Sequence, residues 1–176
     1  MGDGVVRVIE RSRIAEETGI LDLSDCQLMQ VPDAIYHLMR NLRLIQVNLA
    51  RNVIAKLPPK FPLKFSLITK LDMSQNKIRT LPDEFMECSE LTTLDVSHNC
   101  FTYLPSCIFK LPSLRRLKAN NNYITDIDTE RLARKPLLVE IDLRENPISS
   151  TSRRALEAAS APERICRLPI AFWISQ

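Results

Sequence analysis

The segment DVSHNC, residues 95–100, contains the three residue types that serine hydrolases use for nucleophilic catalysis. Asp95, Ser97 and His98 stand close together, but such a trio acts only where the histidine accepts the serine proton beside an oxyanion hole. The alternation of the segment places Asp95 and Ser97 on one face of a strand, and no nucleophile elbow surrounds the serine. The motif therefore predicts no catalytic site.

The sequence also gives no support for a metal site or a phosphate-binding loop. His98 stands near Cys100 and Cys107, but Cys100 is expected beyond a turn, on a different surface from His98. The five cysteines form no CxxC pair, which argues against a zinc site and against a disulfide framework. They are Cys26, Cys88, Cys100, Cys107 and Cys166. Of three glycines two precede residue 5, so no glycine-rich phosphate loop is available. The sequence predicts no enzyme, metal site or cofactor.

The composition is that of a soluble globular protein, with 45% hydrophobic and 26% charged residues among 176. The net charge of +3 is small and the basic residues are interleaved with acidic ones, so no nucleic-acid partner is expected. No run of eighteen apolar residues could span a membrane, and the first residues lack a secretory signal. We expect a monomer in the cytoplasm or nucleus, with a protein partner and no membrane partner.

The asparagine of the opening segment recurs at a regular interval. Six segments align on an asparagine or cysteine, with steps of 26, 24, 23, 23 and 24 residues. The aligned positions are Cys26, Asn52, Asn76, Asn99, Asn122 and Asn146. Around each of them the chain follows the pattern L-x-x-L-x-L-x-x-N/C-x-L, as in ITKLDMSQNKI, and this pattern and period are those of the leucine-rich repeat.

On these motifs the chain resembles leucine-rich-repeat proteins over residues 18–148. Its N-x-I-x-x-L-P form is similar to that of intracellular scaffolds of the family. The segments LDLSDCQLMQVPDAIYHLMRN and LARKPLLVEIDLRENPI resemble the first and last repeats of a short member. The resemblance implies a non-catalytic scaffold or adaptor that binds a protein. The alternative is a regulatory or targeting subunit of an enzyme such as a phosphatase, kinase or ubiquitin ligase.

The predicted fold class is α/β, a right-handed curved solenoid of about six repeats with a parallel sheet on its concave face. Short 3₁₀ or irregular segments are expected on the convex face, including an irregular loop at residues 58–66, and one short helix ending near Arg134. Residues 1–17 are predicted to form an N-terminal capping helix with Val5, Val8 and Ile9 on its inner side. The repeats occupy residues 18–148 and a C-terminal cap or tail occupies residues 149–176. There Phe172, Trp173 and Ile174 are expected to close the core, and the alternative is a peptide that binds a partner.

The recurring asparagine is predicted to be structural. A sharp turn after each strand leaves backbone N–H and C=O groups in the interior, and a carboxamide has two donors and an acceptor to serve them. Cys26 takes the same position in the first repeat, where a small buried thiol suffices because fewer groups need a partner.

The concave face carries the predicted binding surface. Side chains between the inward leucines form three columns across the repeats, and we expect a protein partner to contact their polar members. These are Asn48, Lys70, Asp72, Ser74, Asp95, Ser97, His98, Arg116, Lys118, Asn120, Asp142 and Arg144. Lys70 and Lys118 are expected to neutralise Asp72 and Asp95, which leaves open the alternative of a solvated face whose charges only balance one another.

Overall fold

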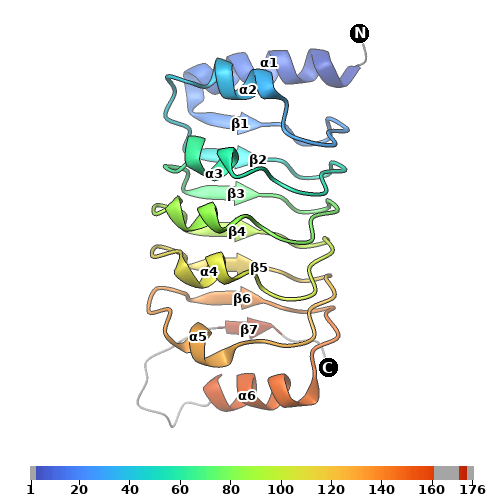
Figure 1. Cartoon of the computed structure of the whole chain (residues 1–176), viewed down its shortest axis with the longest axis vertical. Helices are drawn as coiled ribbons and strands as arrows, with labels where there is room; N and C mark the ends of the chain where they lie inside the picture. Colours follow the sequence, from blue (N-terminus) through green and yellow to red (C-terminus); the bar gives the residue numbers. More distant parts are fainter. Residues whose placement is uncertain (1–2, 161–170, 174–176) are drawn as a thin grey trace.

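The computed structural model describes residues 3–160 and 171–173, and side chains from residue 6 to residue 158. The chain forms a single stack of coils in which each repeat contributes one short strand to a continuous sheet (Figure 1). Helical and irregular segments lie opposite the strands, and a longer helix lies at each end of the stack (Figure 1). The predicted leucine-rich-repeat solenoid is confirmed.

The sheet is parallel throughout, with its strands in sequence order. The strands are β1 (Ile20–Asp22), β2 (Gln46–Asn48), β3 (Lys70–Asp72), β4 (Thr93–Asp95), β5 (Arg116–Lys118), β6 (Glu140–Asp142) and β7 (Ala171–Trp173). The seventh strand was not foreseen by the six-repeat pattern. It is formed by the C-terminal segment and pairs with β6, with Phe172 opposite Ile141, while Ile174 lies outside the described residues.

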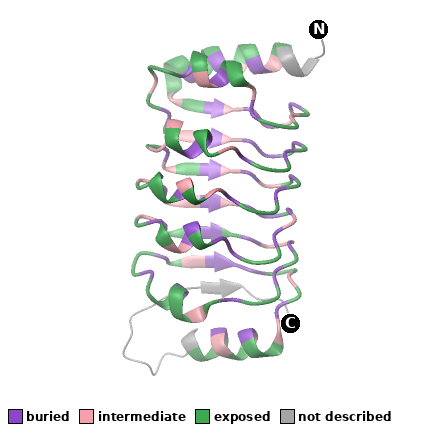
Figure 2. Ribbon diagram, in the orientation of Figure 1, coloured by how far each residue is buried: buried purple, intermediate pink, exposed green. Residues whose placement is uncertain are grey.

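The core lies between the sheet and the convex segments. The middle residue of each strand from β1 to β6 points inward and is at most 2% exposed, because side chains alternate between the two faces of a strand. These residues are Leu21, Val47, Leu71, Leu94, Leu117 and Ile141. Figure 2 shows the buried centres of the strands repeating down the stack, so each repeat covers the apolar edge of its neighbour.

The convex face is more helical than the sequence predicted. It carries α2 (Asp33–Leu38), α3 (Lys60–Lys64), the 3₁₀ helix η1 (Asp83–Glu87), α4 (Ser106–Lys110) and α5 (Thr129–Ala133). A proline precedes the first residue of each of the first four, where it fixes the backbone and removes no helical hydrogen bond. The α5 helix ends next to Arg134 as predicted, and at its start the carboxylate of Asp128 accepts from the amide of Arg131 at 3.0 Å.

The prediction of an irregular loop at residues 58–66 was wrong, since α3 occupies the middle of it. Pro62 fits this helix because it stands in the first turn, where backbone N–H groups have no helical acceptor. Phe61 and Phe65 hold the turn against the core, with their ring centroids 5.2 Å apart and both side chains buried. Aromatic packing thus makes a helix of a proline-rich segment.

Two longer helices cover the ends of the stack, α1 (Asp3–Thr18) and α6 (Ser150–Ser160). The inner face of α1 includes Val8, as predicted, but not Ile9. Val8, Ser12 and Ala15 are buried, whereas Ile9 is 47% exposed, and the side chain of Val5 lies outside the described residues. Steps of four and three residues keep one helical face toward the sheet, and Ile9 stands about 100° round the helix from Val8.

The asparagine side chains join each repeat to the one before it. Asn76 donates from Nδ2 to the carbonyl of Leu49 in the preceding repeat at 2.9 Å, and to the carbonyl of Met73 in its own at 3.1 Å. Its Oδ1 accepts from the amide of Ile54, again in the preceding repeat, at 3.0 Å. The same pattern of donors and acceptors recurs at Asn52, Asn99, Asn122 and Asn146.

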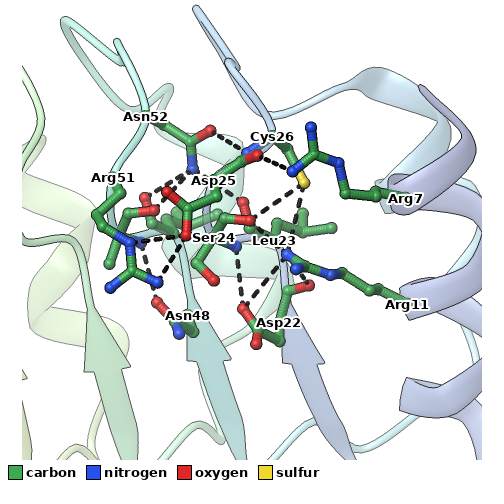
Figure 3. A network of polar contacts seen from close by, with 12 residues as sticks. Arg7, Arg11, Asp22, Leu23, Ser24, Asp25, Cys26, Asn48, Arg51 and Asn52 are labelled. Atoms are coloured by element: carbon green, nitrogen blue, oxygen red, sulfur yellow. Dashed lines mark hydrogen bonds and ion pairs between the residues drawn. The ribbon is translucent and has the colours of Figure 1, made fainter. Parts of the chain in front are cut away.

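No repeat precedes the first one, and two arginines of α1 supply hydrogen-bond donors there instead (Figure 3). Arg7 donates to the carbonyl of Asp25 at 2.8 Å, and Arg11 donates to the carbonyl of Ser24. In the later repeats, carbonyls equivalent to that of Ser24 receive a backbone N–H from the repeat before. No carbonyl of a preceding repeat needs a donor at Cys26. A thiol, which donates one hydrogen bond to the carbonyl of Ser24, is therefore sufficient at this position.

The residue before each of these asparagines, and before Cys26, adopts a left-handed backbone. The φ angles are 52–57° at Asp25, Arg51, Gln75, His98, Asn121 and Glu145, none of which is glycine. Each such residue turns the chain sharply after the strand, and the first five donate their amide to the next repeat. The conformation is disfavoured for side chains with a Cβ, so the turns store strain that the asparagine bonds offset.

Replacing Gln75 by glycine is expected to stabilise the fold. Relief of the left-handed strain, roughly 1–2 kcal/mol, outweighs the roughly 0.5–1 kcal/mol that glycine loses in chain entropy, so the net gain is about 0.5–1 kcal/mol. Chemical denaturation measures it. The matched control is Lys77→Gly two residues on, which lacks the positive φ and should be destabilising. A Gln75→Gly protein less stable than Lys77→Gly would contradict the account.

Removing the carboxamide of Asn76 is expected to lower stability by about 1–3 kcal/mol, because buried backbone groups of two repeats then lose their partner. Asn76→Ser should recover only part of the loss, since one hydroxyl cannot replace two donors and an acceptor. Thermal unfolding of Asn76→Ala, Asn76→Ser and the unmodified chain makes the comparison. An alanine variant that melts within a degree of the parent would refute the structural role.

Candidate functional site

Two columns of side chains run across the concave face, one from the first residue of each strand and one from the last. The register places Lys70 between Gln46 and Thr93 in the first column, and Asp72 between Asn48 and Asp95 in the second. The full second column is Asp22, Asn48, Asp72, Asp95, Lys118 and Asp142. Neighbouring members lie one strand spacing apart, about 4.8 Å, so their charges interact directly.

The second column has a structural task that the sequence analysis missed. In five of the six repeats the aspartate or asparagine accepts, through Oδ1, the backbone N–H of the residue two positions later. Asp72 accepts from the amide of Ser74 at 2.8 Å, and Asn48 accepts from the amide of Ala50 at 2.9 Å. This Asx turn ends the strand and begins the left-handed turn. The recurrence of Asp or Asn two residues before a small residue was the available signal.

Most charges on this face are already paired. Arg11 lies 3.7 Å from Asp22, Lys118 lies 3.6 Å from Asp95, and Arg116 lies 3.3 Å from Glu140. The predicted neutralisation of Asp95 by Lys118 is confirmed. That of Asp72 by Lys70 is wrong, because within the described part of the chain neither side chain makes an ion pair. Both belong to strand β3.

A third column, formed by the residue two positions after each member of the second, includes Ser74, Ser97, Asn120 and Arg144, with His98 at its edge. It is less accessible than the sequence suggested. Ser97 is buried, and its hydroxyl donates to the carboxylate of Asp95 at 2.6 Å. Ser74 and Asn120 are half-buried, whereas Arg144 and His98 are exposed. His98 stands in the left-handed turn at the rim of the sheet. Ser97 therefore supports Asp95 from within and presents little surface to a partner.

Asp142 is the most enclosed carboxylate of the second column. Its side chain is 9% exposed and receives the guanidinium of Arg144 at 2.7 Å and 3.0 Å, together with the Arg144 amide at 3.1 Å. Burial works to raise the pKa of Asp142, but the bonds from Arg144 and the charge of Lys118 outweigh it and hold the pKa below its usual value. Asp142 is ionised, and its carboxylate is already bound by Arg144 of the same chain.

A shallow hollow of about 330 Å³ lies over the first strands of the concave face. Its apolar members include Ile20, Val47 and Leu71, and its polar members include Lys70 and Asp72. A second hollow of about 440 Å³ lies over β5 and β6 and is mainly polar. It is lined by Ser97, Lys118, Asn120, Glu140, Asp142 and Arg144. The face therefore offers two adjoining depressions of different chemistry.

Among the residues that the structure describes, the predicted candidates for catalysis and metal binding are not brought together. Ser97 donates to Asp95 rather than to His98, so no base is placed to accept its proton. Within residues 3–160 and 171–173, no group of three His, Cys, Asp or Glu side chains is placed to hold a metal ion. A search of the same residues finds no helix with the length and apolar character needed to cross a membrane. Burial raises the pKa of the Cys88 thiol to about 12 and that of Cys107 to about 11, which makes both unreactive.

Comparison with known proteins agrees with the repeat geometry. The model of the family described as leucine rich repeat matches residues 40–101 and 89–148. The chain belongs to the leucine-rich-repeat family. Repeats of this family generally act as protein-interaction modules and typically carry no catalytic site.

Relatives of this chain include leucine-rich repeat-containing protein 20. The Mus musculus protein is 41% identical over 157 residues, which cover 87% of this chain and 85% of that protein. The Homo sapiens protein is 34% identical over 88 residues, or 48% of each chain. The likeness seen in the first and last repeats thus extends over most of the mouse protein.

Solved leucine-rich-repeat structures share the fold. An internalin from Listeria monocytogenes superposes with a TM-score of 0.62 at 22% identity, over 84% of this chain and 38% of the internalin. TLR13, in a complex with ssRNA13, gives a TM-score of 0.68 at 22% identity, over 93% of this chain and 23% of TLR13. This chain spans less than half of those longer solenoids, and at such identities the likeness concerns the fold alone.

Replacing Asp142 by asparagine tests its charge separately from its Asx turn, since Asn48 makes the same turn with an amide. We expect a loss of about 1–2 kcal/mol near neutral pH, where the charge-assisted pair with Arg144 disappears. A lowered pKa in the fold gives stability that is present above the ordinary aspartate pKa and lost as pH falls through the lowered value. The difference between the two proteins should therefore shrink on acidification to about pH 2–3. Denaturation at both pH values measures it, and a pH-independent difference would contradict the assignment.

Proposed function

We propose that this chain is a non-catalytic protein-interaction module that binds a protein partner on its concave face. The observation that carries the proposal is the unpaired charge of β3. Lys70 and Asp72 stand two residues apart on the same face with no ion-pair partner among the described residues, while Asp22, Asp95, Glu140 and Asp142 each have a basic partner. Lys70 and Asp72 are therefore the charged groups of this face that remain available to a partner.

Asp72 is oriented before any partner arrives. The amide of Ser74 holds one carboxylate oxygen at 2.8 Å, which leaves the other oxygen for an incoming arginine or lysine. The two neighbours of Asp72 in the column, Asn48 and Asp95, carry no positive charge, and Asp95 is already paired with Lys118. The charge of Arg51 acts on Asp72 without forming an ion pair with it. A fixed acceptor binds with less loss of conformational entropy than a mobile one.

Lys70 complements Asp72 at the edge of the first hollow. It is exposed, and Ile20, which is 42% exposed, supplies apolar side-chain surface to the same hollow. A partner segment with one basic and one acidic side chain about an apolar residue matches this arrangement. Such contacts give specificity and speed association more than they add to affinity.

Two functions fit such a surface, a scaffold or adaptor and a regulatory or targeting subunit of an enzyme. The scaffold is preferred because the face combines shallow hollows with paired charges rather than a deep cleft. The buried, reduced thiols of Cys26, Cys88 and Cys107 suit the cytoplasm or nucleus. Co-purification of a kinase, phosphatase or ligase whose activity changes on binding would favour the regulatory subunit instead.

Asp72→Asn is the test variant, because the amide oxygen keeps the Asx turn and only the charge is lost. A partner is first obtained by affinity purification with the unmodified chain, and binding is then followed by surface plasmon resonance. We expect the variant to bind about 5–20-fold more weakly, mainly through slower association, with a reduced dependence on salt. Its melting temperature should match that of the parent.

The matched controls are Lys77→Ala and Arg79→Ala, two exposed residues beyond the asparagine of the same repeat. Both should leave binding unchanged. If these two changes abolish binding and Asp72→Asn does not, the partner uses another surface and the proposal fails.

A further inference from the structure

The fifth repeat departs from the other five at the end of its strand. The Asx turn needs an oxygen at the last strand position, and Lys118 stands there in place of aspartate or asparagine. A lysine has three donors and no acceptor, so it cannot receive the N–H of Asn120. Among the contacts of the described residues, the amide of Asn120 has no acceptor, whereas the equivalent amides of Ser24, Ala50, Ser74, Ser97 and Arg144 each have one.

We propose that the polar hollow over β5 and β6 accepts an aspartate or glutamate carboxylate of a protein partner, which pairs with Lys118 and receives the N–H of Asn120. The incoming carboxylate would accept the N–H of Asn120 in the fifth repeat as Asp95 accepts the N–H of Ser97 in the fourth. This inference rests on the proposed function and names the chemistry that the partner must supply at this point of the concave face.

Both residues line the same hollow. Lys118 and Asn120 line the hollow of about 440 Å³ together with Ser97 and Arg144. The Lys118 side chain is 53% exposed, and its single ion pair, to Asp95 at 3.6 Å, leaves two of its three N–H groups for another acceptor. A backbone N–H beside an ammonium is a common arrangement for binding an anion.

The carboxylates around the hollow do not exclude a further one. Asp95 receives Lys118, the amide of Ser97 and its hydroxyl, while Asp142 receives the guanidinium of Arg144. Glu140 is paired with Arg116 at 3.3 Å. Lys118, Arg144 and Arg116 thus balance these negative charges within the chain, and the donors that remain are the Asn120 amide and the N–H groups of Lys118 that do not face Asp95.

The five complete turns indicate the geometry that the incoming group should adopt. In them the carboxylate or amide oxygen lies 2.8–3.1 Å from the amide nitrogen two residues later. A partner carboxylate at this distance from the Asn120 nitrogen would point one oxygen at the turn and the other at the Lys118 ammonium. Because the charges around the hollow already balance, a phosphate would add more uncompensated negative charge than a carboxylate, so we assign the site to a carboxylate.

The site can be tested without the partner by titrating the ¹⁵N-labelled full chain with sodium acetate against sodium chloride of equal ionic strength. We expect the Asn120 amide proton to shift downfield and saturate with acetate, and the Ser97 amide, already bonded to Asp95, to stay in place. Lys118→Asn should abolish the shift, because its side chain closes the turn as Asn48 does. Lys118→Met, which removes the charge but offers no acceptor, should keep the shift with weaker binding.

Blocked tripeptides then test the assigned source of the carboxylate. Acetyl-Ala-Asp-Ala-amide should shift Asn120 as acetate does, and acetyl-Ala-Asn-Ala-amide should not. An Asn120 resonance that moves equally with chloride, or that still responds to acetate in Lys118→Asn, overturns the site. A response to acetate but not to the aspartyl peptide overturns its assignment to a protein side chain. None of these outcomes depends on Asp72. A negative result here would therefore overturn only the Lys118 site, and the proposed function would still be tested by the binding of Asp72→Asn.

Discussion

Every repeat of this solenoid depends on satisfying backbone groups that a sharp turn leaves inside the molecule. Where water is excluded, an unpaired N–H or C=O destabilises the fold by about 1–3 kcal/mol, and each turn would leave several. One carboxamide per repeat resolves this, with Nδ2 donating to carbonyls of two successive repeats and Oδ1 accepting an amide from the earlier one. The bonds run backward along the chain, so each repeat is completed by the one that follows it.

That direction explains the two ends. The first repeat has nothing before it to serve, which is why Cys26 suffices where asparagine is otherwise required, and why Arg7 and Arg11 come from α1 to donate to carbonyls there (Figure 3). A guanidinium has five donors in a rigid plane and can reach several carbonyls at once. At the other end, β7 extends the ladder beyond β6.

The regular stacking of the repeats aligns the side chains of the concave face in columns. Some of these side chains have a structural role, and others are available to a partner. Aspartates such as Asp95 and Asp142 end their strands and are held by amides, so their presence alone says little about a partner. The informative positions are departures from the pattern: the unpaired Lys70 and Asp72 on β3, and Lys118 where an acceptor belongs. A surface used only to solvate the sheet would not need them.

The repeat length, the asparagine and the alternating leucines were enough to predict the strands, their parallel register and the buried middle residues, because each is fixed by a local pattern repeated six times. Elements that depend on packing were not predictable in this way. The helix around Pro62 follows from how Phe61 meets neighbouring aromatic rings, and the inner face of α1 follows from which of its residues meet the first strand. Lys118 pairs as expected but Lys70 does not, since the reach of a flexible side chain is decided by its neighbours rather than by its spacing.

Hydrogen exchange of the asparagine side chains tests the ladder most directly. Carboxamide protons can be followed by NMR in the unmodified chain, and the exposed Asn41 provides an internal reference for a solvated amide. The account predicts that the Nδ2 protons of the buried Asn52, Asn76, Asn99 and Asn122 exchange only with unfolding of the stack, orders of magnitude more slowly than those of Asn41. Exchange of Asn76 at the rate of Asn41 would show that the carboxamides do not hold the repeats together.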